Sequence, residues 1–184
     1  MKFNSSYYVF AAPSGGGKTT IVNKLVEKYP ELTISISATT RNKRDYEVDG
    51  REYVFLDINT FKQAIAESKF LEYEEVHGDY YGTLKESVDC IIQSGKKVLF
   101  DIDVNGAFAI KKNYPNAVLF FIKPPSQVEL IKRLKGRKSE TEASIQRRLN
   151  RLEYEYAQAD IFDHIIINDN LDHAIQQIEE LILV

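Results

Sequence analysis

The 184-residue sequence has few of the residues that build disulfide and metal scaffolds. It contains one cysteine, Cys90, three histidines, one methionine and no tryptophan. A single cysteine excludes both an intramolecular disulfide and a cysteine-based metal cluster, which suits a reducing compartment. Cys90 stands in the apolar stretch VDCII, where we expect a buried structural thiol.

Long apolar runs and a strong excess of one charge are also missing. No apolar run approaches the roughly 20 residues of a membrane-spanning helix, and residues 1–10 lack the apolar core and cleavage site of a signal peptide. The formal net charge of −3 provides no overall attraction for nucleic acid or for a membrane surface. We therefore expect a cytoplasmic protein that binds neither, and phosphate binding would have to come from locally placed cations.

Apolar runs alternate with segments of helical periodicity along most of the chain. The runs typical of buried strands cover residues 7–12, 97–103, 117–122 and 162–168. The segments typical of helices cover residues 18–29, 105–114, 126–136, which starts at a serine cap, and 171–182. Strands separated by helices predict an α/β fold with a parallel sheet and right-handed crossovers.

The alternation breaks at about residue 35 and resumes at about residue 85. Short, partly alternating strands are predicted over residues 33–40, 51–57 and 69–78. One helix is predicted among them over residues 59–68, with Asn59 as its cap. We interpret residues 35–84 as a small mixed or antiparallel insert on the parallel core.

A second break covers residues 136–150, which are basic and acidic by turns. We interpret them as a flap, or lid, that leads into a long helix ending near Ala159; the alternative is an ordinary solvated helix pair. The whole chain is then one domain, whose core consists of residues 1–34, 85–135 and 151–184.

A glycine-rich loop follows the first predicted strand in the segment APSGGGKTT. The glycines at 15–17 allow backbone N–H groups to turn toward a phosphate, and the helix that follows adds the positive end of its dipole. Lys18 and Thr19 match the end of a P-loop, in which the lysine reaches the terminal phosphates and the hydroxyl ligates Mg²⁺. Ala12 replaces the first glycine of that pattern, which is compatible with function if its φ is negative. The alternative is a glycine-rich turn with a chance lysine.

Two other features favour phosphoryl chemistry. The strand over residues 97–103 contains Asp101, which beside a P-loop can hold Mg²⁺ through water, although apolar strands often end in aspartate. Arg41 and Arg44 stand close together, and two such guanidiniums repel unless an anion lies between them; the alternative is a solvated basic loop. Tyr53 and Tyr81 either offer hydroxyls to the same anion or pack within strands.

Several motifs, in order along nearly the whole chain, resemble those of guanylate kinases. They are SATTRNKRDYEVDGREYVF, FLEYEEVHGDYYGT, DIDVNGA, PPS, RLKGRKSETEASIQRRL and INDNLD. The resemblance implies a P-loop core that binds ATP, an insert that binds GMP, and a helical lid. The implied reaction is the Mg²⁺-dependent, reversible conversion of ATP and GMP into ADP and GDP in purine metabolism, by a monomer or homodimer.

The resemblance also implies roles for individual residues. The catalytic groups would be Lys18, Arg44, Arg137 and Arg148. The ATP-binding residues would be Ser14, Gly15, Gly16, Gly17, Lys18, Thr19, Thr20, Arg133, Asn168 and Asp169. The GMP-binding residues would be Ser37, Arg41, Arg44, Glu47, Tyr53, Glu72, Tyr81, Thr83, Asp101 and Asp103. The Mg²⁺ ligands would be Thr19 and, through water, Asp101.

The chemistry of guanine agrees with these assignments. Guanine presents its N1–H and its N2 amine side by side, so Glu72 can accept from both, whereas adenine has an acceptor at N1. A base that leaves such buried groups unpaired is rejected by roughly 10⁴-fold. Ser37 can donate to guanine O6, and Glu47 is placed to orient one of the arginines. No general base is required, because the phosphate oxygen of GMP is already a nucleophile.

Some residues depart from the family pattern, and two other functions have to be weighed. Lys43, Tyr46 and Lys138 replace residues that are commonly proline or glycine, which affects loop geometry more than chemistry. One alternative is a non-catalytic protein-binding module of the same fold, against which the intact P-loop and arginines argue. The other is a P-loop kinase for a different phosphorylated acceptor, such as a phosphoribosyl compound, against which Glu72 and Asp103 argue. For the kinase we expect an open free form and a closed form with both nucleotides.

Overall fold

Five parallel strands form the main sheet of the computed structural model, which describes residues 2–76, 78–135 and 142–184, with side chains from residue 149 onward in the last segment. The strand order is β2-β7-β1-β8-β9, and every neighbouring pair is parallel. The strands are β1 (Tyr7–Ala11), β2 (Leu32–Ile34), β7 (Lys97–Asp101), β8 (Val118–Lys123) and β9 (His164–Ile167). The predicted parallel α/β fold is confirmed.

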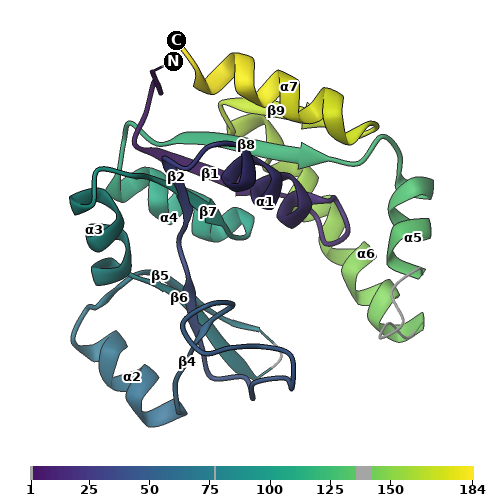
Figure 1. The fold of residues 1–184 in the computed structure, drawn as a ribbon. Helices are drawn as coiled ribbons and strands as arrows, with labels where there is room; N and C mark the ends of the chain where they lie inside the picture. Colours follow the sequence, from purple (N-terminus) through teal and green to yellow (C-terminus); the bar gives the residue numbers. More distant parts are fainter. Residues whose placement is uncertain (1, 77, 136–141) are drawn as a thin grey trace.

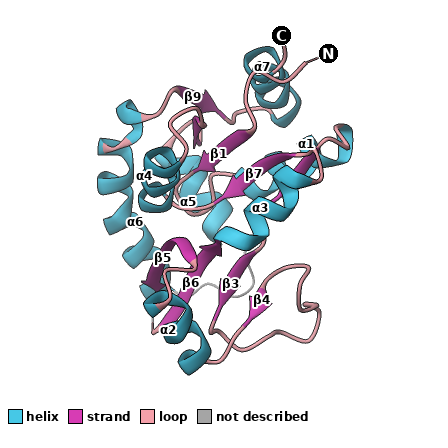
Figure 2. Cartoon of the chain, turned by 90° about the vertical axis from the view of Figure 1, so that its left-hand side faces the viewer, coloured by secondary structure: helices cyan, strands magenta, loops and turns pink. Residues whose placement is uncertain are grey.

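Helices cover both faces of this sheet (Figures 1 and 2). One face packs against α1 (Lys18–Lys28) and α7 (Leu171–Ile182), and the other against α3 (Lys85–Gln93) and α4 (Val104–Asn113). Successive strand residues point to opposite faces, so in β1 Phe10 joins the first core and Val9 the second. Burial on both faces explains why the strand sequences are continuously apolar.

A second, four-stranded sheet lies beside the first and is drawn at the lower left of Figure 1. Its order is β4-β3-β6-β5; β3 and β4 are parallel and the other pairs antiparallel. The elements are β3 (Ser37–Thr39), β4 (Val54–Phe55), α2 (Ile58–Ala66), β5 (Phe70–Val76) and β6 (Asp79–Leu84). Phe61 and Ala64 of α2 pack on Ala38 and Phe70 of this sheet, which gives it a small core of its own.

The remaining helices form a pair at one side of the main sheet. They are α5 (Gln127–Lys135) and α6 (Glu142–Ala157), followed by the short helix η1 (Ala159–Ile161). Leu130 and Leu134 of α5 pack against Leu152 of α6. The predicted serine cap of α5 is present, because the Ser126 hydroxyl accepts from the Glu129 N–H at 3.1 Å. None of the helices described in the structure is both long and apolar enough to cross a membrane.

Several local predictions were wrong or incomplete. Residues 33–40 do not form one strand, because β2 pairs with β7 in the main sheet and β3 pairs with β6 in the second. Neither α3 nor β6 was predicted from the sequence. The cap of α2 is Asp57, not Asn59, since the Asp57 carboxylate accepts from the N–H groups of Asn59 and Thr60.

Cys90 is exposed on α3 and is not the buried thiol that we expected. Val88 is the residue of α3 that is fully buried against the main sheet, and Cys90 lies two residues further along the helix. Two residues correspond to about 200° of helix, so the thiol faces away from the core.

Candidate active site

The loop between β1 and α1 forms a tight turn around its glycines. Gly15 and Gly17 have φ angles of +93° and +91°, which favour glycine, and the Gly16 N–H donates to the Pro13 carbonyl at 2.8 Å. Ser68 is the one non-glycine residue with a positive φ in the part of the chain that the structure describes. Ala12 therefore meets the condition for a working loop, and the replacements at Lys43 and Tyr46 are not strained by a positive φ.

Lys18, Thr19 and Asp101 meet where β1 and β7 end. Lys18 Nζ lies 2.6 Å from Asp101 Oδ1 and donates to the Ile102 carbonyl at 2.5 Å. Thr19 Oγ1 donates to Asp101 Oδ2 at 2.7 Å. Ligands of open parallel sheets bind beyond the carboxyl ends of the strands, so this cluster lies where a nucleotide phosphate is expected. Ser14 is half-buried at the start of the turn and Thr20 is exposed on α1.

Asn168, which follows β9, holds the same loop through a hydrogen bond. Its buried side chain donates through Nδ2 to the Gly16 carbonyl at 2.9 Å, and its own carbonyl accepts from Arg133 Nη2 at 3.1 Å. Arg133 also pairs with Glu129 at 3.1 Å. Asp169 is exposed, and its carboxylate accepts from the neighbouring Asn170 N–H at 2.6 Å. Of these residues, Asn168 makes a direct hydrogen bond to the P-loop.

Glu47 organises both arginines of the second sheet's loop. Its buried carboxylate pairs with Arg41 Nη2 at 2.7 Å and accepts from the Arg44 N–H at 2.8 Å. The hydrogen bond from Arg41 lowers the pKa of Glu47, so this carboxylate stays ionised. The guanidinium of Arg44 donates to the Tyr46 hydroxyl at 2.9 Å, and Tyr46 itself is largely exposed.

Two tyrosines lie beside Arg41. The Arg41 guanidinium lies 5.5 Å from the ring centre of Tyr53, and the rings of Tyr53 and Tyr81 meet edge to face at 6.0 Å. The Arg41 guanidinium and the two tyrosines therefore form one cluster of donors, while the Arg44 guanidinium contacts Tyr46. Such a set of donors suits the several oxygens of a phosphate.

Ser37, Thr83 and Glu72 lie on one rung across three neighbouring strands. Ser37 of β3 is the register partner of Thr83 in β6, and Thr83 is the partner of Glu72 in β5. Glu72 Oε1 accepts from Thr83 Oγ1 at 2.5 Å. Burial raises the pKa of Glu72, and the nearby negative charge of Asp103 raises it further. The rung thus offers hydroxyls and a carboxylate, the groups needed to read the edge of a base.

Asp103 approaches this rung from the start of α4. Its Oδ1 caps the helix by accepting from the Gly106 N–H at 2.8 Å, and its Oδ2 accepts from Arg151 Nη2 at 2.6 Å. Burial by itself would raise the pKa of Asp103, but hydrogen bonds from Glu74 and from Gly106, together with Arg151, lower it. Glu74 carries the opposite shift: its hydrogen bond to Asp103, its burial and the Asp103 charge raise its pKa to about 7.

Arg151, Glu74 and Glu155 are the residues of this region that sequence reasoning missed. Arg151 and Glu155 do show a signal, because they stand four residues apart and pair at 3.3 Å within α6. That spacing is equally typical of an ordinary surface ion pair. Arg137 and Lys138 lie outside the described residues, and of Arg148 the structure describes only the backbone in α6.

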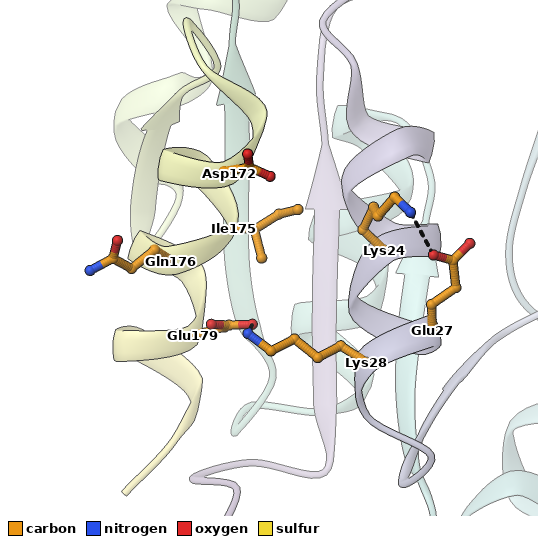
Figure 3. A pocket seen from close by; sticks show the side chains of 7 residues that line it. All are labelled: Lys24, Glu27, Lys28, Asp172, Ile175, Gln176 and Glu179. Atoms are coloured by element: carbon orange, nitrogen blue, oxygen red, sulfur yellow. Dashed lines mark hydrogen bonds and ion pairs between the residues drawn. The ribbon is translucent and has the colours of Figure 1, made fainter.

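The described chain has a cavity near the candidate site and a groove away from it. One of about 360 Å³ lies between β5 and α4, and its lining includes Glu72, Glu74 and Gly106. The other, of about 560 Å³, lies between α1 and α7 (Figure 3), where Lys28 reaches Glu179 at 2.6 Å and Lys24 pairs with Glu27. None of the residues that line this second groove is a predicted site residue.

A family model described as guanylate kinase matches residues 4–183. The chain belongs to the guanylate kinase family. The chain is 46% identical over 176 residues to a guanylate kinase from Chlorobium chlorochromatii, covering 95% of this chain and 93% of that protein. It is 38% identical over 175 residues to a guanylate kinase from Thermotoga maritima, covering 95% and 84%.

A solved structure shares the fold of this guanylate kinase family member. The crystal structure of guanylate kinase from Anaplasma phagocytophilum matches with a TM-score of 0.77 and 26% identity, over 98% of this chain and 86% of that one. The match covers both sheets and the helices around them, because it leaves out only 2% of the chain.

Proposed function

We infer that this chain is an ATP:GMP phosphotransferase, which converts ATP and GMP into ADP and GDP. The observation that carries the acceptor assignment is the rung of Ser37, Thr83 and Glu72, on which a half-buried carboxylate stands beside two hydroxyls. The Glu72 carboxylate accepts the N1–H and N2 amine of guanine, and the Ser37 hydroxyl donates to O6. The N1 lone pair of adenine would oppose the carboxylate and leave it unpaired.

On the donor side, the P-loop binds the phosphates of ATP. The Lys18 ammonium is held at the mouth of the loop by Asp101, within reach of an incoming terminal phosphate. The positive end of α1 adds to this attraction. We assign the adenosine side to Arg133, Asn168 and Asp169, of which Asn168 also braces the loop.

Mg²⁺ fits the cluster at the end of β7. The Thr19 hydroxyl and the Asp101 carboxylate are hard oxygen donors 2.7 Å apart, the type of ligand that Mg²⁺ prefers. Bound there with ATP, the ion would neutralise charge on the phosphates. These same two residues would hold it, Asp101 through water.

The phosphate of GMP binds among the donors around Glu47. Arg41, Arg44, Tyr53 and Tyr81 supply positive charge and hydroxyl groups, and the Glu47 carboxylate fixes the Arg41 guanidinium in place. An arginine fixed before binding loses less side-chain freedom when the anion arrives. The GMP oxygen can then attack without a general base.

Two moving parts complete the proposal. Residues 35–84 act as the acceptor unit, and residues 136–150, with Arg137 and Arg148, act as a lid that adds positive charge around the transferring group. Closure over both nucleotides excludes water, which would otherwise accept the phosphoryl group.

A coupled ADP-release assay with ATP and each of GMP, AMP, UMP and CMP tests this function. Turnover should be confined to GMP. Glu72→Gln keeps the shape of the side chain but adds an amide donor opposite guanine N1–H, so kcat/KM for GMP should fall by roughly 10²-fold or more. Glu75→Gln, at an exposed position of the same strand, is the matched control and should retain full turnover.

Three outcomes would contradict the proposal. Equal use of several monophosphates would remove the base-reading role of the rung. Preference for a phosphoribosyl acceptor would favour a different P-loop kinase. A fall in the melting temperature of Glu72→Gln large enough to account for its loss of turnover would make Glu72 a structural carboxylate.

A further inference from the structure

Arg151 of α6 joins three carboxylates from three parts of the fold. Its Nη2 lies 2.6 Å from Asp103 Oδ2, at the start of α4, and 3.5 Å from Glu74 Oε1, in β5. Its Nε lies 3.3 Å from Glu155 Oε1 within α6. One side chain therefore links the end of the main sheet, the second sheet and helix α6.

These groups are only partly accessible to water. The side chains of Arg151, Glu74 and Asp103 are 38%, 33% and 30% exposed, and that of Glu155 is 10% exposed. Three carboxylates thus face one guanidinium in a region where charge is incompletely solvated. The Arg151 guanidinium lies within 4 Å of all three carboxylates and so offsets part of the repulsion among them.

The same contacts fix both oxygens of Asp103. Oδ1 accepts from the Gly106 N–H at 2.8 Å, and Oδ2 accepts from Arg151 at 2.6 Å. The plane of the carboxylate is set by these two donors together, and each oxygen keeps a second lone pair for another donor. If Arg151 is substituted, the hydrogen bond from the Gly106 N–H remains as the main restraint on the plane of the Asp103 carboxylate.

Asp103 also lies close to Glu72. A methyl group added at Gly106 would be 3.3 Å from Asp103 Oδ1 and 3.3 Å from Glu72 Oε2, so both carboxylates converge on the same spot. Glu74 stands two residues from Glu72 on β5, on the strand that carries the base-reading carboxylate. The position of Arg151 therefore bears on both carboxylates that face the base.

We propose that Arg151 is a positioning residue for guanine recognition, which acts by orienting the Asp103 carboxylate. The inference rests on the proposed function, in which Glu72 reads guanine, and on the family resemblance, which places Asp103 among the guanine-reading residues. Arg151 does not touch the P-loop residues in the contacts described above, so its effect should be confined to the acceptor.

Steady-state kinetics of Arg151→Met, Arg151→Lys and Asp103→Asn provide the test, with GMP and ATP varied separately. Arg151→Met should raise KM for GMP about three- to tenfold, the loss expected for a partly exposed charged hydrogen bond, and leave KM for ATP within about twofold. Arg151→Lys keeps the charge and should recover part of the loss. Arg51→Met, which removes an exposed ion pair with Glu52, is the matched control.

The double variant Asp103→Asn with Arg151→Met separates positioning from direct contact. If Arg151 acts through Asp103, the double variant should bind GMP no worse than Asp103→Asn alone. Melting temperatures of all variants show whether a change in KM reflects folding, and Arg151→Lys remains informative if Arg151→Met does not fold.

The outcomes distinguish this inference from the proposed function. If Asp103→Asn raises KM for GMP and Arg151→Met does not, the acceptor site stands and the positioning role is wrong. If Arg151→Met is defective and Asp103→Asn is not, Arg151 acts without Asp103 and the positioning role is again wrong. If neither variant changes KM for GMP, the proposed reading of guanine by Asp103 fails as well.

Discussion

Replacement of Gly17 by alanine should lower the free energy of unfolding. The structure allows us to divide this loss into two parts. Gly17 has a φ of +91°, and an L-residue at positive φ costs about 1–2 kcal/mol. The new Cβ would also overlap Asn168 Nδ2. Asn168 would have to move and lose its 2.9 Å bond to the Gly16 carbonyl, which adds about 1 kcal/mol. The expected loss in unfolding free energy is therefore about 2–3 kcal/mol.

Gly95→Ala isolates the first of these parts. Gly95 has a φ of +80°, and among the described residues no atom lies within 4 Å of a Cβ built there. This variant should lose only the backbone cost of about 1–2 kcal/mol. Urea unfolding followed by far-UV circular dichroism measures both losses, and equal m-values would show that the two variants unfold alike.

The kinetic effect of Gly17→Ala should follow the same contact. Displacement of Asn168 disturbs the carbonyl of Gly16 within the P-loop, so KM for ATP should rise while KM for GMP stays close to that of the parent protein. Gly95→Ala should change neither. If Gly17→Ala and Gly95→Ala lose unfolding free energies that agree within about 0.5 kcal/mol, the role of Asn168 is refuted, because its overlap with the new Cβ would then cost nothing.

Two further predictions concern carboxylates of the second sheet. Glu47→Gln removes the charge that holds Arg41, so KM for GMP should rise while KM for ATP does not, and a GMP titration that matches the parent protein would contradict this. Glu74 has a pKa raised to about 7 by its hydrogen bond to Asp103, by burial and by the Asp103 charge. The folded protein therefore binds the proton more tightly than the unfolded chain, and unfolding free energy should fall as pH rises from about 4.5 to about 7. Since the side chain is a third exposed, solvent screening reduces this fall to about 1 kcal/mol, and urea unfolding of Glu74→Gln across this range should lack it.

The main sheet could be predicted because its strands are buried on both faces. Such strands read as continuous apolar runs, and the helices between them carry clear periodicity. The second sheet gave weaker signals. The segment TISISATT passes from β2 to β3 without a glycine or proline, so nothing in it marks the change of sheet. In α3, Val88, Ile91 and Ile92 stand at helical spacing and pack toward the main sheet, so the sequence did carry a helical signal there, and the prediction passed over it.

The candidate site was predictable where its contacts are local to a motif. The P-loop residues and the arginines near Glu47 lie within short segments, and their chemistry follows from residue type. Arg151 meets Asp103 across 48 residues and Glu74 across 77 residues. Asp103 was assigned through its motif, whereas Arg151 and Glu74, taken alone, resemble solvated charges on a helix and a strand, and only the fold brings them to Asp103.

The departure at Ala12 is explained by a neighbour in the loop. A P-loop brings two stretches of backbone close together, and here the Gly16 N–H bonds to the Pro13 carbonyl at 2.8 Å. A Cβ built on Gly16 would lie 3.0 Å from the Ala12 Cβ and 3.0 Å from that carbonyl, so there is room for one methyl group at this approach but not for two. Because the φ of Ala12 is not positive, its methyl group adds no strain. The requirement for glycine at this close approach therefore rests on residue 16, which is why alanine at residue 12 is compatible with a phosphate-binding turn.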